Sequence, residues 1–229
     1  MVGVDLNSER LPSRSDERNY KDLEPYYTVG CLNGPVSGLI DQLGFLKAMV
    51  STKNNPSIFS GIATDLLKET EKKVRLARTD GFQAIAITDD IAGNRGLYFS
   101  SGYFEETVWP VYREMAGIIK DKGLSVFFHS DGDLRPILEL LIQAGVDCIH
   151  PVDTQAGQDL YELEKKFGER VSFMGHIDPL TWSRERVEQE IDRAEKAFKK
   201  GGLILGSTCG LSMETFNDQW EILYPGGRE

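Results

Sequence analysis

The side chains of this sequence that could do chemistry stand at one kind of position, the end of a short apolar stretch typical of a buried strand. They are His129, His150, His176, Cys209 and the adjacent pair Asp89-Asp90. In a parallel α/β barrel, the loops that follow the carboxyl ends of the strands form the active site. The pattern therefore predicts that His129 and Cys209 face a shared pocket at that edge of the sheet.

A zinc site is the first chemistry that these residues suggest. Because side chains alternate along an extended chain, FFHSDGD is expected to place His129 and Asp131 on one side, with Ser130 turned away. Cys209 follows the last apolar stretch, which closes next to the early strands in a barrel. Imidazole, carboxylate and thiolate all bind zinc, and three protein ligands with one open position are the usual catalytic arrangement. The alternative is that His129 hydrogen-bonds Asp131 and that Cys209 is a small core residue.

The two acidic residues at the end of FQAIAITDD are further catalytic candidates beside His129. One of the carboxylates of Asp89 and Asp90 is expected to point into the barrel and the other toward the following loop. Paired carboxylates raise one another's pKa and suit proton transfer, or one of them could ligate the metal. A loop cap beside IAGNRG is the alternative.

Four more polar side chains are expected to line the pocket and bind substrate: Arg95, His150, His176 and Asp178. Arg95 could bind a substrate carboxylate. His150 precedes a proline, which holds it in an extended conformation. Each of these side chains could equally be solvated or satisfied by an internal hydrogen bond.

Six apolar stretches have the continuous hydrophobic character of strands buried on both faces: YYTVGC, FQAIAIT, LSVFFH, VDCIH, VSFMGHI and GLILGS. Two amphipathic helices lie between them. One in DLRPILELLIQAG is expected to begin at the N-cap Asp133 and to stop at Gly145. The other begins at Ser183 and ends at Gly201-Gly202.

Repeated strand–helix units of this kind require a parallel sheet covered by helices, either a closed barrel or an open doubly wound sheet. No Gly-rich phosphate turn follows any of the strands, and polar residues end nearly all of them, which favours a TIM-type (β/α)8 barrel. Eight strands close such a barrel. Six predicted strands therefore indicate that the first βα units are lacking or truncated.

The whole chain of 229 residues sets limits on partners and compartment. Its 36 acidic and 26 basic residues give a net charge of −10, which disfavours nucleic acid and membrane surfaces as partners. Three cysteines without framework spacing indicate thiols in a reducing compartment, and neither a secretory signal nor a spanning apolar run is evident, so we expect a cytoplasmic protein. Residues 1–25 are expected to form a polar arm, and residues 26–229 one barrel domain.

The stretches HSDGDLRPILELLIQAGVDCIHPVDTQAG, FGERVSFMGHIDP and LILGSTCGL resemble the uroporphyrinogen decarboxylase (URO-D) superfamily. The resemblance runs in order from YYTVGCLNGPVSGLIDQLGF through GFQAIAITDDIAG and covers most of residues 26–223. It implies an (α/β)8 barrel of one of two branches. These are the decarboxylases of haem synthesis and the methyltransferases that move methyl groups between substrates, corrinoid proteins and thiols.

The methyltransferase branch is the closer of the two. The Arg-rich N-terminal segment, early-strand aspartate and Gly-His-Gly of the decarboxylases are not evident, and the last strand ends in Thr208-Cys209-Gly210. The methyltransferases hold zinc with a His-x-Cys after one strand and a Cys after the last. His129 and Cys209 match this pattern, whereas Asp131 stands where the branch often has cysteine. The resulting harder site favours an oxygen-bound substrate.

We therefore expect a zinc-assisted methyltransferase that acts on a small molecule, works with a corrinoid carried by a partner protein, and could form homo-oligomers. One alternative is a URO-D-like lyase of porphyrin and haem biosynthesis, which needs no metal. A second is an incomplete barrel that serves as a subunit of a larger complex, with its exposed sheet edges as the interface.

Overall fold

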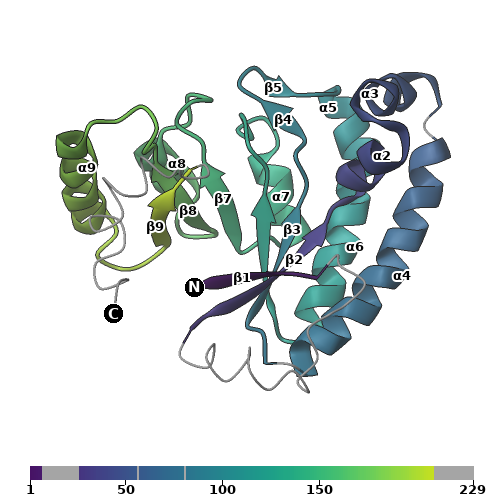
Figure 1. Cartoon of the computed structure of the whole chain (residues 1–229), viewed down its shortest axis with the longest axis horizontal. Coiled ribbons are helices and arrows are strands. Elements are labelled where there is room, and N and C mark those ends of the chain that lie inside the picture. The colour runs from purple at the N-terminus through teal and green to yellow at the C-terminus, as the bar shows by residue number, and fades with distance from the viewer. Residues whose placement is uncertain (7–25, 56, 80, 209–229) are drawn as a thin grey trace.

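A computed structural model describes residues 1–6, 26–55, 57–79 and 81–208 of the chain. Its main feature is a curved sheet of seven parallel strands in the spatial order β1-β2-β3-β6-β7-β8-β9 (Figure 1). The strands are β1 (Val2–Asp5), β2 (Thr28–Asn33), β3 (Ala84–Thr88), β6 (Ser125–His129), β7 (Cys148–Val152), β8 (Ser172–Ile177) and β9 (Leu203–Ser207). A short antiparallel hairpin, β4 (Ala92–Gly93) and β5 (Gly96–Leu97), follows β3.

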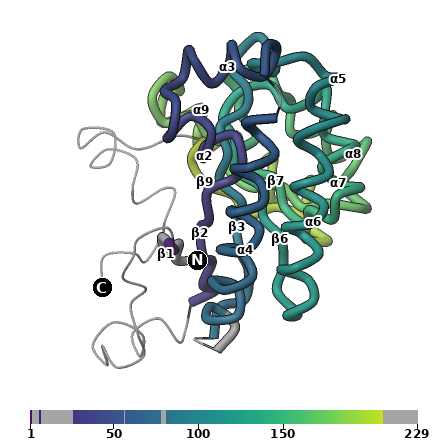
Figure 2. The backbone as a smooth tube through the Cα atoms, turned by 90° about the vertical axis from the view of Figure 1, so that its right-hand side faces the viewer, coloured from purple at the N-terminus to yellow at the C-terminus, as the bar shows by residue number. Residues whose placement is uncertain are grey.

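Helices connect the strands and lie along the outer face of the sheet (Figures 1 and 2). They are α2 (Pro35–Leu43), α3 (Phe45–Asn54), α4 (Ser57–Thr79), α5 (Ser101–Tyr103), the π-helical segment η2 (Phe104–Val108), α6 (Trp109–Lys120), α7 (Leu138–Ala144), α8 (Leu160–Phe167) and α9 (Arg184–Ala197). Among the described residues, none of these helices combines the length and the apolar composition needed to cross a bilayer.

This is the TIM-type α/β architecture that the sequence predicts, with fewer units than a full barrel. The helices follow parallel strands in chain order. Apart from the β4–β5 hairpin, each strand from β2 onward pairs with the strand that comes next in the sequence. Within the described part of the chain, β1 and β9 form the two edges of the sheet. Eight strands make a complete barrel of this type, and seven are described here.

All six strands expected from the apolar stretches are present, and β1 is an additional one. Val2–Asp5 lies within the expected polar arm and pairs in parallel with β2, while residues 7–25 lie outside the described residues. The start of the helix after Ser183 is confirmed, since the Ser183 side chain accepts a hydrogen bond from the Arg186 N–H, but the helix ends at Ala197, before the expected Gly201-Gly202. Gly145, in the left-handed region with φ 106°, ends α7 as expected.

The expected start of α7 is wrong. The helix begins at Leu138, with Ile137 as its N-cap, so Asp133 does not cap it. The Asp133 carboxylate instead binds the backbone N–H and the guanidinium of Arg135, at 2.8 Å for Nε. Residues 135–137 form a turn before the helix, and the apolar residues Leu134, Ile137, Leu138 and Leu141 of the segment are nevertheless buried.

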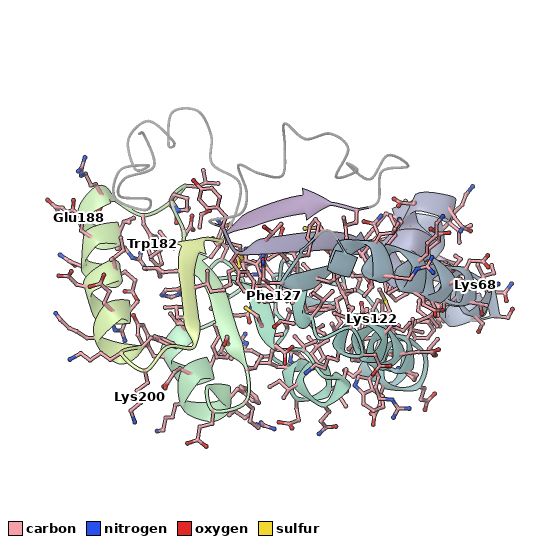
Figure 3. All side chains as sticks on the ribbon, turned by 90° about the horizontal axis from the view of Figure 1, so that it is seen from below. Lys68, Lys122, Phe127, Trp182, Glu188 and Lys200 are labelled. Atoms are coloured by element: carbon pink, nitrogen blue, oxygen red, sulfur yellow. The ribbon has the colours of Figure 1, made fainter. Side chains whose placement is uncertain are left out.

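The cluster of buried apolar residues is much larger on the outer face of the sheet than on its inner face. The outer face and the helices share one large cluster of buried residues, including Tyr112, Phe128 and Phe173. The inner face carries a small cluster of Val29, Ala84, Ala86, Phe127 and Cys148. Figure 3 shows Phe127 near the middle of the molecule. Because strand side chains alternate, the inner-face rows continue through Phe127 to His129 and through Cys148 to His150.

Gly132 shows how closely the loop after β6 approaches the hairpin. Its φ is +90°, and an added Cβ would lie 2.6 Å from the backbone of Ala92 and Gly93. Its N–H donates to the Asp153 carboxylate at 2.9 Å, and its carbonyl accepts from the Gln158 amide at 2.8 Å. The loop that carries Asp131 is therefore fixed on both sides.

Replacing this glycine should destabilise the fold more than replacing a glycine with the same backbone conformation and free space. Gly123 also has positive φ, and nothing lies within 4 Å of its added Cβ. Gly123→Ala should cost about 1–2 kcal/mol for the left-handed backbone alone. Gly132→Ala should cost clearly more in urea unfolding, because the backbone of the hairpin must also move. Equal losses in the two variants would contradict the close approach.

Candidate metal centre

Three side chains from two neighbouring strands meet at the carboxyl edge of the sheet. Asp90, His129 and Asp131 each offer a ligand atom, and these atoms all lie within 4.8 Å of one another. The Nε2 atom of His129 is 3.7 Å from Oδ1 of Asp90. The backbone N–H of Asp131 donates to the same carboxylate oxygen at 3.2 Å. Both carboxylates are exposed, and the imidazole is half-buried.

Strand register and alternation explain this convergence. Thr88 and His129 are Cα partners in the β3–β6 ladder, and the Asp89 N–H donates to the His129 carbonyl at 2.9 Å. Counting in steps of two, Asp90 continues the inner row of β3 and Asp131 that of β6. Ser130 faces away, as the alternation predicts, and its buried hydroxyl accepts from the Ile91 N–H at 3.1 Å.

His150 extends the same row onto the next strand. It is the Cα partner of His129 in the β6–β7 ladder, and the two Nδ1 atoms are 2.7 Å apart. The rings are stacked, with centroids 4.9 Å apart. The pKa of His150 is lowered to about 4, mainly by burial and to a smaller extent by the neighbouring charge of His129. His150 is therefore a neutral imidazole at pH 7.

The electrostatics at Asp131 reflect a crowd of acidic groups. Burial raises its pKa above the ordinary value, His129 lowers it, and the negative charges of Asp90 and Asp153 raise it again. Asp153 follows β7 and its carboxylate accepts three backbone N–H groups, those of Gly132, Gln155 and Ala156. The negative charges of Asp90 and Asp153 thus both act on Asp131, an arrangement that a bound cation would relieve.

Asp89 does not join this cluster, although it is the neighbour of Asp90 in the chain. It points to the helical side of the sheet, is fully buried, and accepts the N–H groups of Val36 and Ser37 at the first turn of α2. The Tyr112 hydroxyl donates to it at 2.6 Å. Asp89 therefore acts as the cap of α2, since Gly34 at the N-cap position has no side chain to do so. An added Cβ at Gly34 would collide with the Asp89 carboxylate.

Of the expected substrate-binding residues, His150 contacts a member of the cluster, His129, and the other three have different surroundings. Arg95 is exposed at the turn of the β4–β5 hairpin. Asp178 is buried, and its carboxylate binds the backbone N–H groups of Leu180 and Thr181 within its own loop. Cys209 lies outside the described residues.

His176 has a place on the outer side of the sheet. It is buried with φ +86°, and its Nε2 is 3.0 Å from Glu190 of α9, which also accepts the Tyr161 hydroxyl. Its ring meets Trp182 edge-on, and Figure 3 shows Trp182 beside α9. Two consecutive positive φ angles, at Gly175 and His176, interrupt the alternation that would have turned this ring inward.

The donor set suits a divalent cation. Imidazole nitrogen and carboxylate oxygen are both common zinc ligands. Because these three residues include no thiolate, they are also compatible with harder metals. Sequence reasoning did not single out Asp90 as the carboxylate of the pair that reaches the metal position, and it missed Asp153. A carboxylate just after β7 was a usable signal for Asp153, because the ends of neighbouring parallel strands meet at one edge.

A parallel α/β sheet with polar side chains gathered at its carboxyl edge is typical of TIM-type α/β proteins. The sequence itself shows which family of this class the chain belongs to. Residues 35–224 match the uroporphyrinogen decarboxylase (URO-D) family. The chain belongs to this family. A comparison with curated proteins found no match.

Solved structures share the fold at low sequence identity. A methyltransferase from Methanosarcina mazei superposes with a TM-score of 0.65 at 17% identity, over 80% of this chain and 53% of that one. A putative vitamin-B12 independent methionine synthase from Listeria monocytogenes gives 0.51 at 14% identity, over 86% and 61%. A sugar phosphate isomerase/epimerase from Parabacteroides distasonis gives 0.52 at 11% identity, over 92% and 76%. The chain thus spans between half and two thirds of the first two.

The Asp89–Tyr112 contact predicts a stability difference that depends on pH. Burial raises the pKa of Asp89 from 3.8 to about 6, against the lowering effect of the Tyr112 hydroxyl. The folded state therefore holds this proton more tightly than the unfolded chain, and the stability so gained is complete below pH 3.8 and is lost as pH rises through about 6.

Tyr112→Phe should accordingly cost more at pH 8 than at pH 4. At pH 8 the hydroxyl donates to a charged carboxylate and its loss should cost about 1.5–3 kcal/mol in urea unfolding, against about 0.5–1.5 kcal/mol at pH 4. Tyr103→Phe is the control, because the buried Tyr103 hydroxyl has no hydrogen-bond partner among the described residues. A Tyr112→Phe cost that is independent of pH would contradict this account of Asp89.

Proposed function

We propose that this chain is a metal-assisted methyltransferase, with zinc as its metal. The proposed ligands are His129, Asp131 and Cys209, and Asp90 completes or orients the set. The observation that carries the proposal is the convergence of Asp90, His129 and Asp131 within 4.8 Å at the carboxyl edge of the sheet. Membership of the URO-D family and the fold shared with a methyltransferase from Methanosarcina mazei support the choice of reaction.

The protein residues hold the site in place through the backbone. β6 presents His129 at the end of an inner-face row, and the Asp131 N–H fixes the Asp90 carboxylate from the other strand. The Gly132 backbone, bound by Asp153 and Gln158, sets the position of Asp131. A divalent cation held there would act as a Lewis acid on the heteroatom that carries or receives the methyl group.

The donor set also bears on the substrate. A carboxylate in place of thiolate gives a harder site, and hard metal centres prefer oxygen ligands. We propose a small substrate that binds through oxygen, such as a methoxy compound or an alcohol acceptor. A corrinoid on a partner protein is the proposed methyl carrier, in accordance with the methyltransferase branch of the family.

The proposal predicts tight binding of one Zn²⁺ that depends on the cluster. His129→Ala and Asp131→Asn should each weaken binding by at least about 100-fold in a chelator competition, because even the partners of metal ligands are worth about 10- to 100-fold. Asp65→Asn is the matched control, since Asp65 is an exposed carboxylate on α4 that takes no part in the cluster. Wild-type protein that binds no zinc, or variants that bind it equally well, would contradict the metal site.

The reaction itself can be tested with methylcobalamin as the corrinoid. The zinc-loaded chain should catalyse demethylation of methylcobalamin in the presence of a suitable acceptor, followed by the change in cobalamin absorbance, and His129→Ala should abolish it. A panel of alcohols, phenols and thiols identifies the acceptor. A metal-free chain that releases carbon dioxide from uroporphyrinogen would instead favour the lyase and contradict the methyltransferase.

A further inference from the structure

We propose that His150 is a positioning residue for the metal centre. In this proposal the Nδ1 of His150 accepts the N–H of His129 Nδ1, which leaves Nε2 of His129 as the nitrogen that binds the metal. The inference rests on the proposed function, because it assigns a task to the partner of a proposed metal ligand. Sequence reasoning gave His150 only a place in the substrate pocket.

The Nδ1 atoms of His129 and His150 are 2.7 Å apart. At this distance one nitrogen must carry a hydrogen and the other must offer a lone pair, since two N–H groups would repel and two lone pairs would repel. A neutral imidazole has one N–H, so the choice made at Nδ1 decides the state of Nε2 in both rings. Only two arrangements of a neutral pair are therefore available.

The two arrangements differ in what they offer to a cation. If His150 donates, His129 carries its hydrogen on Nε2, the atom that lies 3.7 Å from Oδ1 of Asp90, and that nitrogen cannot bind a metal. If His129 donates, its Nε2 presents a lone pair toward the carboxylates of Asp90 and Asp131. Metal-binding histidines usually donate their other N–H to a fixed acceptor, which sets both tautomer and ring orientation.

His150 is well placed to be that fixed acceptor. It is the register partner of His129 on the adjacent strand, so the two side chains leave the sheet side by side. The His150 carbonyl accepts the Ser130 N–H at 3.1 Å. This hydrogen bond extends the β6–β7 ladder past the contact between His129 and His150. The two ring planes are inclined by only 28°, so a hydrogen bond between the Nδ1 atoms can lie close to the plane of both rings. The pair is therefore held by the sheet and not by a mobile loop.

Two substitutions of His150 distinguish the effect of its hydrogen-bond acceptor from the effect of its aromatic ring. His150→Phe keeps an aromatic ring in the space but has no acceptor, whereas His150→Asn offers its Oδ1 close to the place of Nδ1. Zn²⁺ and Co²⁺ affinities from chelator competition should fall by about 10- to 100-fold in His150→Phe and should largely be retained in His150→Asn. Equal affinity in wild type and His150→Phe would overturn the proposal, as would equal losses in the two variants.

Tautomers read by NMR provide a second measurement that needs no variant to fold. The chain has three histidines, so a long-range ¹H–¹⁵N spectrum of labelled wild-type protein contains three imidazoles, and His176 is the internal reference. With Zn²⁺ added, His129 should carry its hydrogen on Nδ1 and show a metal-shifted Nε2, and His150 should carry its hydrogen on Nε2. A hydrogen on Nε2 of zinc-loaded His129 would overturn the proposal.

These outcomes separate the two levels of inference. Wild-type protein that binds no zinc would overturn both the proposed metal centre and the role of His150. Zinc binding that requires His129 and Asp131 but is indifferent to His150→Phe would leave the proposed function intact and overturn the positioning role alone.

Discussion

Parallel pairing in one register joins β2, β3 and β6 and continues into β7 at the level of His129 and His150. All else at the candidate site depends on this pairing. The pairing aligns the carboxyl ends of the strands. Asp90, His129 and His150, which are 21 to 60 positions apart in sequence by subtraction of their numbers, therefore meet at one edge. A slip of one residue in β6 would turn His129 and Asp131 to the helical side and bring Ser130 into their place.

The same alternation gives two adjacent aspartates different work. Asp89 lies on the helical side, where it is buried and caps α2 with help from Tyr112, and Asp90 lies on the inner side, where it is exposed beside His129. Burial without a cationic partner raises the pKa of Asp89, yet three hydrogen bonds make the carboxylate tolerable there. One dipeptide thus fastens α2 to the sheet and supplies a side chain to the site.

The sequence was sufficient to predict the parallel α/β class, six strands and the start of the helix after Ser183, because continuous apolar runs and small capping residues are local signals. Features that depend on a particular side-chain pairing, on backbone angles or on strand register could not be predicted. Asp133 has the type of an N-cap, but its pairing with Arg135 decides otherwise. His176 has the position of a pocket residue, but the positive φ angles at Gly175 and His176 turn it toward α9. The contact of His150 with His129 depends on register, which no single strand reveals.

A crystal of the zinc-loaded chain, measured at energies on both sides of the zinc absorption edge, tests the central claim most directly. The account predicts one strong anomalous peak at the carboxyl edge of the sheet, in contact with the Nε2 of His129, a carboxylate oxygen of Asp131 and the Sγ of Cys209, with the Asp90 carboxylate bound to it or beside it. Anomalous density elsewhere, or at this edge without His129 among the ligands, would contradict it.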